Sequence, residues 1–261
     1  RVQLPKLQTS AAREKTLAGL KTAGDVSPLI STNWHGRDYV LATADIHYNP
    51  ILNQLVYNVI EPILSDDLKD LVGKTTELLH DRLEVDFSKL QEKKELYAYL
   101  DAQVDEVWDY LGVKLSDEEA IKVKYYIYRG VVGHDKIEPL MRDPNIEDIS
   151  CDGVGTPIFV FHRNPLYGSL ATNIWFETKV ELDSFVMKLA QKAGRTVSVA
   201  SPLLDAALRD GSRLQVTYGT DIARHGSNFS IRKFFKVPLT VIDLLNYKTA
   251  DALVLAYLWL A

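Results

Sequence analysis

Apolar residues recur at helical spacing through the middle of the chain, and this pattern predicts three amphipathic helices between residues 66 and 133. The second runs from about Ser88 to Leu111. The third begins at Ser116, where Ser-Asp-Glu-Glu is typical of a capping box. Apolar positions that would face one another in the first two helices are Leu68, Leu71, Val72, Leu78, Leu79, Tyr97, Leu100, Val104, Val107, Trp108 and Leu111.

Alternating apolar and polar positions predict a β-hairpin before these helices. The segments YVLATADIHY at 39–48 and QLVYNVI at 54–60 have strand character, and Asn49-Pro50 marks the turn between them. Residues 1–38 are polar and keep no sustained period, so we expect a mobile or extended arm there.

Helical and strand patterns are mixed after residue 134. A short helix, IEPLMRD, ends before Pro144, and the segments 146–151 and 157–162 form strands. A longer helix with one apolar stripe covers 179–193, and two further strands run from Leu214 to Tyr218 and from Phe229 to Phe234. This order predicts an α+β fold with a small antiparallel sheet backed by helices.

Between the longer helix and the last two strands, the chemistry of Ser201-Pro202 favours the start of another helix. In that helix Leu203, Ala206 and Ala207 would face inward, and Gly211 would end it in a left-handed turn.

The chain is divided into four parts by these patterns. They are the arm at 1–38, a hairpin and helical docking domain at 39–133, an α/β domain at 134–235, and a final segment at 236–261. Pro238 indicates a hinge within 236–240, and the helices that follow keep their apolar face as far as Ala261. We therefore expect the last segment to be the truncated start of a further domain.

The amino-acid composition excludes some classes of protein function. The 261 residues are 46% hydrophobic and 25% charged, as in a globular protein. A net charge of -5 with a pI near 5.7 argues against a general nucleic-acid binder. A single cysteine, Cys151, excludes an intramolecular disulfide framework, and the sequence shows neither a leader nor a membrane-spanning run, so we expect a cytoplasmic protein.

The usual catalytic and metal-binding patterns are missing from the sequence. Gly73-Lys74-Thr75 has the end of a phosphate-binding loop but lacks the earlier glycine, and it falls within a predicted helix. The six histidines have no pair at ligand spacing, and Cys151 has no neighbouring partner. We predict neither a metal site nor a catalytic residue, and we expect Cys151 to be a buried apolar residue.

Three arginines interrupt the pattern of the last two strands. Arg213 enters the first strand, Arg224 lies in the connecting loop, and Arg232 points away from the face that buries Ile231. A guanidinium group offers fixed N–H donors to a carboxylate or a phosphate. The arginines therefore either pair with nearby acids such as Asp205, Asp210 and Asp221 or bind an external anion.

The motifs DGSRLQV and RHGSNFSIRKF resemble the N-terminal domain of the type II/IV secretion ATPases, the hexameric motors of secretion, pilus and archaellum assembly, and most of all their archaeal branch. IEPLMRDPNIEDISCDGVGTPIFVFHR at 137–163 and YNVIEPILS at 57–65 agree, and together the motifs cover roughly 39–250. The resemblance implies a PAS-like N-terminal domain followed by the start of a RecA-like domain.

In such motors ATP and Mg²⁺ are held by the RecA-like domain, and arginines of the GSR and SIR motifs close over the nucleotide. Matched residue by residue, these are Arg213 and Arg232, with Arg224 as a third candidate. The resemblance places the phosphate-binding loop and the catalytic acids beyond Ala261, so this chain alone should bind no cofactor and hydrolyse no ATP.

The same resemblance implies a hexamer that is attached peripherally to a membrane through the cytoplasmic face of an inner-membrane platform protein. Two other functions stay open on the sequence alone. The first is a non-enzymatic adaptor that binds proteins through its helices. The second is single-stranded nucleic-acid binding by the arginines with Phe229 and Phe234, although these two phenylalanines also fit a core.

Overall fold

A nine-stranded mixed sheet runs through the part of the chain that the structure describes. This computed structural model describes residues 24–82, 93–221, 223–234, 240–246 and 248–260. Along the sheet the strands follow the order β1-β2-β3-β6-β5-β4-β9-β8-β7, and among these neighbours β3 and β6 are parallel. The strands are β1 (Asp25–Trp34), β2 (Arg37–Asn49), β3 (Gln54–Ile60), β4 (Ile146–Cys151), β5 (Phe159–His162), β6 (Ser169–Thr172), β7 (Leu203–Ala207), β8 (Arg213–Thr217) and β9 (Asn228–Arg232).

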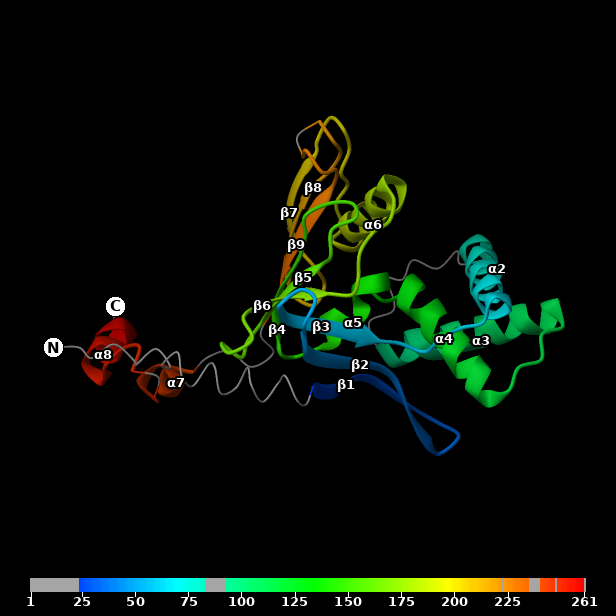
Figure 1. Ribbon diagram of the computed structural model, residues 1–261, viewed down its shortest axis with the longest axis horizontal. Helices are drawn as coiled ribbons and strands as arrows, with labels where there is room; N and C mark the ends of the chain where they lie inside the picture. Colours follow the sequence, from blue (N-terminus) through cyan, green and yellow to red (C-terminus); the bar gives the residue numbers. More distant parts are fainter. Residues whose placement is uncertain (1–23, 83–92, 222, 235–239, 247, 261) are drawn as a thin grey trace.

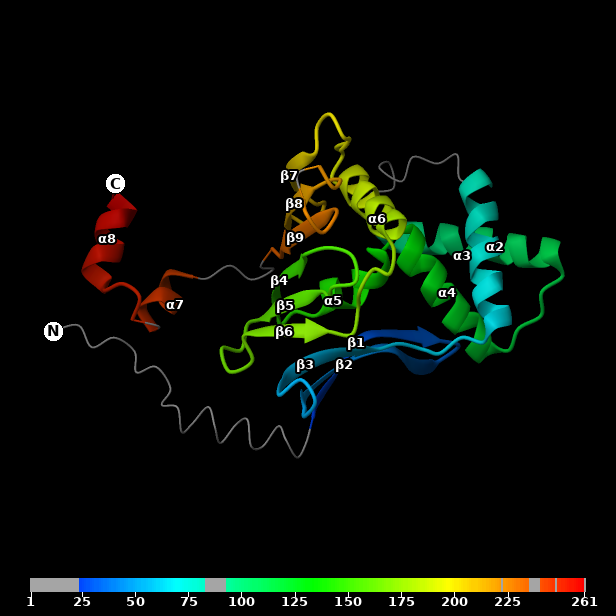
Figure 2. The same cartoon turned by 45° about the horizontal axis from the view of Figure 1, so that its top comes forward.

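The helices gather in three places. In Figures 1 and 2, α2 to α4 lie together beyond one end of the sheet, α6 lies against β7 to β9, and α7 and α8 lie apart from the rest. The bounds are α2 (Asp66–Arg82), α3 (Lys93–Leu111), α4 (Asp117–Val131), η1 (Asp135–Ile137), α5 (Glu138–Arg142), α6 (Lys179–Lys192), α7 (Val241–Asn246) and α8 (Ala252–Leu260).

The main core lies between one face of the sheet and the helices α5 and α6. Alternate residues of β4, β8 and β9 face it, as their period of two requires. Helix α6 adds a stripe of apolar side chains, each 5% exposed or less, that is buried in this core. Among the core residues are Ile149, Cys151, Phe176, Leu182, Phe185, Val186, Leu189, Leu214, Val216, Phe229 and Ile231.

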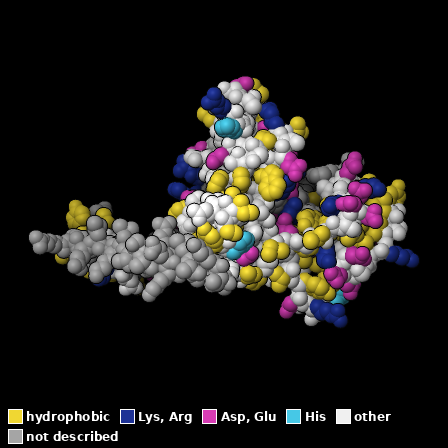
Figure 3. All heavy atoms as spheres, in the orientation of Figure 1, with side chains coloured by type: hydrophobic (Ala, Val, Ile, Leu, Met, Phe, Trp, Pro, Cys, Tyr) yellow, Lys and Arg dark blue, Asp and Glu magenta, His cyan; other side chains and the backbone are white. Residues whose placement is uncertain are grey.

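The predicted helical unit is present and has a core of its own. Val104, Val107 and Trp108 of α3 pack there with residues of α2 and α4. The capping box at Ser116 is confirmed, since its side chain accepts from the backbone N–H of Glu119 and the Glu119 carboxylate accepts in return from Ser116. The part of the second predicted helix from Ser88 to residue 92 lies outside the described residues. Charged side chains of both signs cover this unit on the face seen in Figure 3.

The N-terminal hairpin is confirmed as β2 and β3, but it has a third strand that the sequence analysis assigned to the arm. Strand β1 pairs antiparallel with β2 from Asp25 to Trp34, with register shifts beside Pro28. The expectation of an arm is therefore wrong for 25–34 and for the start of β2, while residues 1–23 lie outside the described residues. Because of the proline and the irregular register, apolar and polar residues in this segment do not alternate as they do in a regular strand.

The predicted helix after Ser201 is wrong, because Leu203–Ala207 forms the edge strand β7. Its Leu204 and Ala206 face the core side, whereas Leu203 is 68% exposed and Ala207 is also exposed. Gly211 has a φ of +87°, but it belongs to the turn between β7 and β8 and does not end a helix. The backbone pairing with β8 outweighs the local helix-start signal of Ser-Pro.

The α+β class is confirmed, but the sheet is larger than predicted and is mixed. The short strand β6 was not predicted, and its parallel pairing with β3 joins the hairpin to the rest of the sheet. The hinge expected at 236–240 lies outside the described residues except for its last position, and α7 and α8 contain no buried residue. Within the described segments, every helix is too short or too polar to cross a membrane.

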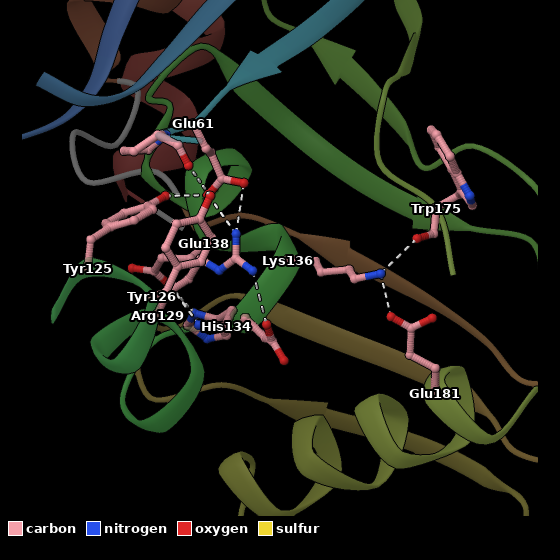
Figure 4. A network of polar contacts seen from close by, with 11 residues as sticks. Glu61, Tyr125, Tyr126, Arg129, His134, Lys136, Glu138, Trp175 and Glu181 are labelled. Atoms are coloured by element: carbon pink, nitrogen blue, oxygen red, sulfur yellow. Dashed lines mark hydrogen bonds and ion pairs between the residues drawn. The ribbon is translucent and has the colours of Figure 1, made fainter. Parts of the chain in front are cut away.

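A polar network fixes the helical unit to the sheet (Figure 4). Arg129 of α4 donates from Nη1 to both carboxylate oxygens of Glu61, which follows β3, at 2.7 and 2.8 Å. The guanidinium also lies 4.7 Å from the ring centre of Tyr126, and Tyr125 donates its hydroxyl to Glu61. The Arg129 and Glu61 side chains are only 13% and 20% exposed, so this is a largely buried ion pair.

A second part of the network surrounds Glu138 at the start of α5. Its carboxylate accepts from the backbone N–H of His134 at 2.8 Å and from Nε of Arg142 at 2.6 Å, and it lies 2.9 Å from Nδ1 of His134. Burial alone would raise the Glu138 pKa, but these hydrogen bonds and the charge of Arg142 outweigh it and lower the pKa to about 2.

We therefore expect Glu138 to make folding sensitive to acid. Because its pKa is lower in the folded protein, the stabilisation is complete above its ordinary value of 4.5 and is lost as the pH falls towards about 2. A shift of this size corresponds to about 3 kcal/mol in the free energy of unfolding. Urea unfolding at pH 6 and pH 3 should show a smaller pH dependence for Glu138→Gln than for the wild type. Equal pH dependence would contradict this, and Glu118→Gln, at an exposed site, is the matched control.

Candidate functional site

Arg213 and Arg232 lie directly opposite each other on the neighbouring strands β8 and β9. Both side chains are exposed, by 64% and 71%. Leu214 and Ile231, the next residues along the two strands, are fully buried on the other face of the sheet. Since side chains alternate along a strand, the buried apolar residues force both arginines onto the uncovered face. The structure thus brings two of the three predicted site residues together.

The uncovered side of β4, β9, β8 and β7, which we call the exposed face, is mostly polar. A shallow hollow of about 590 Å³ lies on it, in the row of residues next to the arginine pair. Both polar residues, such as Gln215 and Ser230, and apolar residues, such as Leu203, line this hollow. Residues on the exposed face are Asp148, Ser150, Leu203, Asp205, Ala207, Arg213, Gln215, Thr217, Asn228, Ser230 and Arg232.

Each arginine of the pair is held by a carboxylate on the strand beside it. Arg213 donates from Nε and Nη2 to the two oxygens of Asp205 on β7, at 3.0 and 2.5 Å. Arg232 donates from the same two atoms to Asp148 on β4, at 2.9 and 3.3 Å. The hydrogen bonds with Arg213 lower the Asp205 pKa, and those with Asp205 raise the Arg213 pKa. Pairing of Arg213 with Asp205, one of the acids named from the sequence, is confirmed.

The pairing of Arg232 with Asp148 was not predicted as such. From the sequence, Glu147 and Asp148 fit salt-bridge or capping partners, but the partner of Asp148 could not be identified, because Arg232 is 84 positions away and meets it through the antiparallel pairing of β4 with β9. Sequence spacing carries no signal for a contact of this kind. The only available indication was that Asp148 alternates with the buried Ile149 and so belongs to the opposite face.

The residues before Arg213 in the DGSR motif build the turn that positions it. Ser212 is 1% exposed, and its backbone N–H and hydroxyl donate to the two oxygens of Asp210 at 3.0 and 2.9 Å. The Ser212 hydroxyl also accepts from the backbone N–H of Phe234 at 3.1 Å. Gly211 has positive φ, and a Cβ there would lie 3.1 Å from the Phe234 ring. The turn is therefore tied to the end of β9, where Arg232 lies.

The small residues of the HGSN segment have a similar structural role at the other end of the hairpin. Ser227 is fully buried, donates its hydroxyl to Asp183 of α6 at 2.5 Å and accepts from the backbone N–H of Gly219 at 2.9 Å. Gly226 adopts a φ of +90° in this turn. These contacts anchor the β8–β9 hairpin on the helix that covers its buried face.

Arg224, the third candidate, lies in the loop that joins β8 to β9 and is exposed. Arg213 begins β8 and Arg232 ends β9, so both stand at the opposite end of the hairpin from this loop. A strand of five residues spans roughly 13 Å between its end residues. The structure does not bring Arg224 to the arginine pair.

Polar residues of the earlier motifs hold the framework beneath the exposed face. The hydroxyl of the fully buried Tyr57 donates to Oδ2 of Asp143 at 2.6 Å, which links the YNVIEP and IEPLMRD segments. Lys233 follows Arg232 directly and is 9% exposed. Its Nζ donates to the backbone carbonyls of Leu140, at 3.0 Å, and Asp143. Lys233 therefore secures the end of β9 against the end of α5.

The remaining sequence candidates are structural. Gly73-Lys74-Thr75 lies within α2, as predicted, and Thr75 is fully buried and accepts from Nε1 of Trp108 at 3.2 Å. Cys151 is buried as predicted, and burial raises the pKa of its thiol to about 11. In the described part of the chain, no three His, Cys, Asp or Glu side chains gather closely enough to hold a metal ion.

The arginine pair has the donors that recognition of a phosphate group requires. Two guanidinium groups side by side present two permanent positive charges and several fixed N–H groups to one exposed position. Both are already paired with carboxylates, so an anion would have to compete for them. The hollow beside them is open towards the exposed face.

No family model matches the sequence. The chain is 42% identical over 183 residues to "Uncharacterized protein MJ1288" of Methanocaldococcus jannaschii, and the match covers 70% of this chain and 71% of that protein. It is also 40% identical over 148 residues to "Uncharacterized protein MJ0900" and 38% identical over 137 residues to "Uncharacterized protein MJ0781" of the same organism. The match covers only 26% and 18% of these two proteins, so the chain spans a small part of their length.

Among solved structures, the chain is similar to the VirB11 ATPase from the Brucella suis type IV secretion system, determined in complex with sulphate. The identity is 20%, the TM-score is 0.36, and the match covers 43% of this chain and 34% of that chain. A similarity this low supports no conclusion about function.

Proposed function

Because the chain belongs to the family of the Methanocaldococcus jannaschii protein MJ1288, whose name states no activity, we propose a function from the residues of the chain itself. The chain is the N-terminal portion of a hexameric ATP-driven motor that serves type II secretion, pilus assembly or archaellum assembly. Its PAS-like α/β domain supplies arginines to ATP that a following RecA-like domain holds together with Mg²⁺.

The observation that carries this proposal is the position of Arg213 and Arg232. They belong to two motifs, GSR and SIR, that are separated in the sequence and both resemble the secretion ATPases. They lie opposite each other on neighbouring strands and on the exposed face. Ser212 of the GSR motif and Ser227, which precedes the strand that carries SIR, are buried and form the turns. The two arginines are thus outside the core and exposed, and their partners are the surface carboxylates Asp205 and Asp148.

The proposed chemistry is positioning and charge neutralisation. As water attacks the terminal phosphorus of ATP and ADP leaves, negative charge spreads over the phosphoryl oxygens. Two guanidinium groups in contact with these oxygens would stabilise that charge. Because the contact needs the terminal phosphate, it would form with ATP and break with ADP. The α/β domain would then rotate on the proposed hinge at 236–240 during each cycle.

The proposed location, oligomeric state and partner of the protein follow from the same function. The motor works in the cytoplasm as a hexamer and is bound peripherally to a membrane by the cytoplasmic face of a platform protein. The unit of α2 to α4 is the proposed docking domain for that protein. It is fixed to the sheet through Glu61 and Arg129, so a force on the helices would pass to the sheet that carries the arginine pair.

The test is steady-state ATP hydrolysis by the longer protein that contains this segment, measured beside residues 1–261. We expect turnover by the longer protein only, since the proposed phosphate-binding loop and catalytic acids lie outside this chain. Turnover by residues 1–261 would contradict the division of roles. Absence of turnover in both would contradict the motor and favour a non-enzymatic adaptor.

A further inference from the structure

Two carboxylates flank the arginine pair, one on each side. Across the strands β4, β9, β8 and β7, the charged side chains follow the order Asp148, Arg232, Arg213, Asp205. Each arginine directs its Nε and one Nη nitrogen towards its own carboxylate. The four charges therefore add to zero, and the exposed face carries no net charge at this position.

This arrangement offsets a repulsion that the fold creates. Arg213 and Arg232 are directly opposed in the strand pairing, and like charges in that position destabilise a sheet. The carboxylates reduce this repulsion. They also weaken the attraction of the site for a phosphate, because each places a negative charge within hydrogen-bond distance of the donors that the phosphate needs.

The two ion pairs lie at the surface, where an incoming anion can replace the carboxylates. Their side chains are 64% and 51% exposed for Arg213 and Asp205, and 71% and 29% exposed for Arg232 and Asp148. Ion pairs exposed to this degree contribute little to stability and open readily. The pair of Arg129 with Glu61, by contrast, is 13% and 20% exposed and is suited to a permanent contact.

We propose that Asp148 and Asp205 hold the arginine pair in a resting state and are displaced from it when a phosphate chain binds. This inference rests on the proposed role of Arg213 and Arg232 in binding phosphate. The two carboxylates then determine how strongly a phosphate ligand must bind to the arginines before it can replace them. A single phosphate competes poorly with two bidentate partners, whereas the terminal part of a polyphosphate carries enough charge to replace both. Asp148 and Asp205 are therefore regulatory positions of the same site.

The experiment is calorimetric titration of residues 1–261 with sodium tripolyphosphate at low ionic strength. Asp148→Asn and Asp205→Asn keep the size of the side chain and remove its charge, so they preserve the strand pairing. We expect each to bind tripolyphosphate about two- to fivefold more tightly than the wild type, and the double variant about tenfold more tightly. Asp221→Asn makes the same charge change in the loop at the other end of the hairpin and should leave the affinity close to that of the wild type.

A second measurement, thermal melting, separates replacement of the carboxylates by phosphate from a general effect of charge on affinity. Without ligand, the double aspartate variant should melt at a lower temperature than the wild type, because Arg213 and Arg232 then face each other without partners. Tripolyphosphate should restore its melting temperature and should raise that of the wild type less. A purely structural role of the carboxylates would lower the melting temperature without this recovery.

The outcomes distinguish the inference from the function on which it rests. Loss of tripolyphosphate binding in Arg213→Ala/Arg232→Ala, with unchanged or weaker binding in the aspartate variants, would overturn the resting state and leave the arginines as phosphate ligands. Unchanged binding in the double arginine variant would overturn both proposals. Absence of binding by the wild type and the double aspartate variant alike would also overturn the inference.

Discussion

Replacement of Arg232 by alanine in the longer protein is expected to lower ATP turnover at least tenfold without unfolding the protein. Arginines that stabilise the transition state of phosphoryl transfer contribute about 10³ to 10⁵ in rate, so a tenfold loss is a conservative expectation. The side chain is 71% exposed and outside the core, so its removal should leave the fold intact. Turnover is measured by phosphate release, and folding by circular dichroism and thermal melting.

Arg213→Ala should behave in the same way, because the two residues occupy one pair. If both arginines contact one phosphate group, the double variant should lose less than the product of the two single effects. Arg195→Ala removes an exposed arginine after α6, which covers the opposite face of the sheet, and serves as the matched control. Unchanged turnover in Arg232→Ala would remove this residue from the mechanism. A loss in Arg224→Ala as large as that in Arg232→Ala would indicate that the loop, and not the pair, approaches the nucleotide.

Replacement of Arg129 by alanine is expected to destabilise residues 1–261 by about 3 to 5 kcal/mol. The change leaves the Glu61 carboxylate in a site where it is 20% exposed, with only the Tyr125 hydroxyl as a remaining side-chain partner among those described. Burial would lower the Arg129 pKa, but the Glu61 charge outweighs it and raises the pKa, so the cation is strongly held. The free energy of unfolding is measured by urea denaturation.

A matched control lies on the same helix. Lys122 pairs with Glu118 one turn away and at the surface, so Lys122→Ala should cost less than about 1 kcal/mol. Glu61→Gln combined with Arg129→Met removes both charges and should be less destabilising than Arg129→Ala alone. Equal stability of Arg129→Ala and the wild type would show that the helical unit is not held to the sheet by this pair.

The sequence predicted those parts of the fold in which a single local pattern dominates. The helices α2 to α4, helix α6 and the strands β2, β3, β8 and β9 all have regular apolar spacing. Strand β1 was not predicted, because Pro28 interrupts its alternation of apolar and polar positions. Strand β7 was predicted as a helix because Ser201-Pro202 is a strong local start signal, and only pairing with β8 makes it a strand. The parallel contact between β3 and β6 joins residues such as Val56 and Ala171, for which local pattern carries no information.

The sequence likewise predicted only part of the candidate site. The resemblance of two motifs selected Arg213 and Arg232, and the alternation around Ile231 indicated the face on which Arg232 lies. That the two arginines are strand neighbours follows from the register of β8 and β9. The pairing of Asp148 with Arg232 depends on tertiary structure and could not be derived from spacing. The structure therefore adds the contact of Asp148 with Arg232, which together with that of Asp205 and Arg213 makes a balanced group of four charges.

The most direct test of the central claim is the affinity of the longer protein for ADP and for a non-hydrolysable ATP analogue, compared between the wild type and Arg213→Ala/Arg232→Ala. If the arginine pair contacts the terminal phosphate, the double variant should bind the ATP analogue at least tenfold more weakly, since two charge-assisted hydrogen bonds are worth about 1.5 to 3 kcal/mol each. Its affinity for ADP should be unchanged. Equal losses for both nucleotides, or no loss for either, would contradict the account.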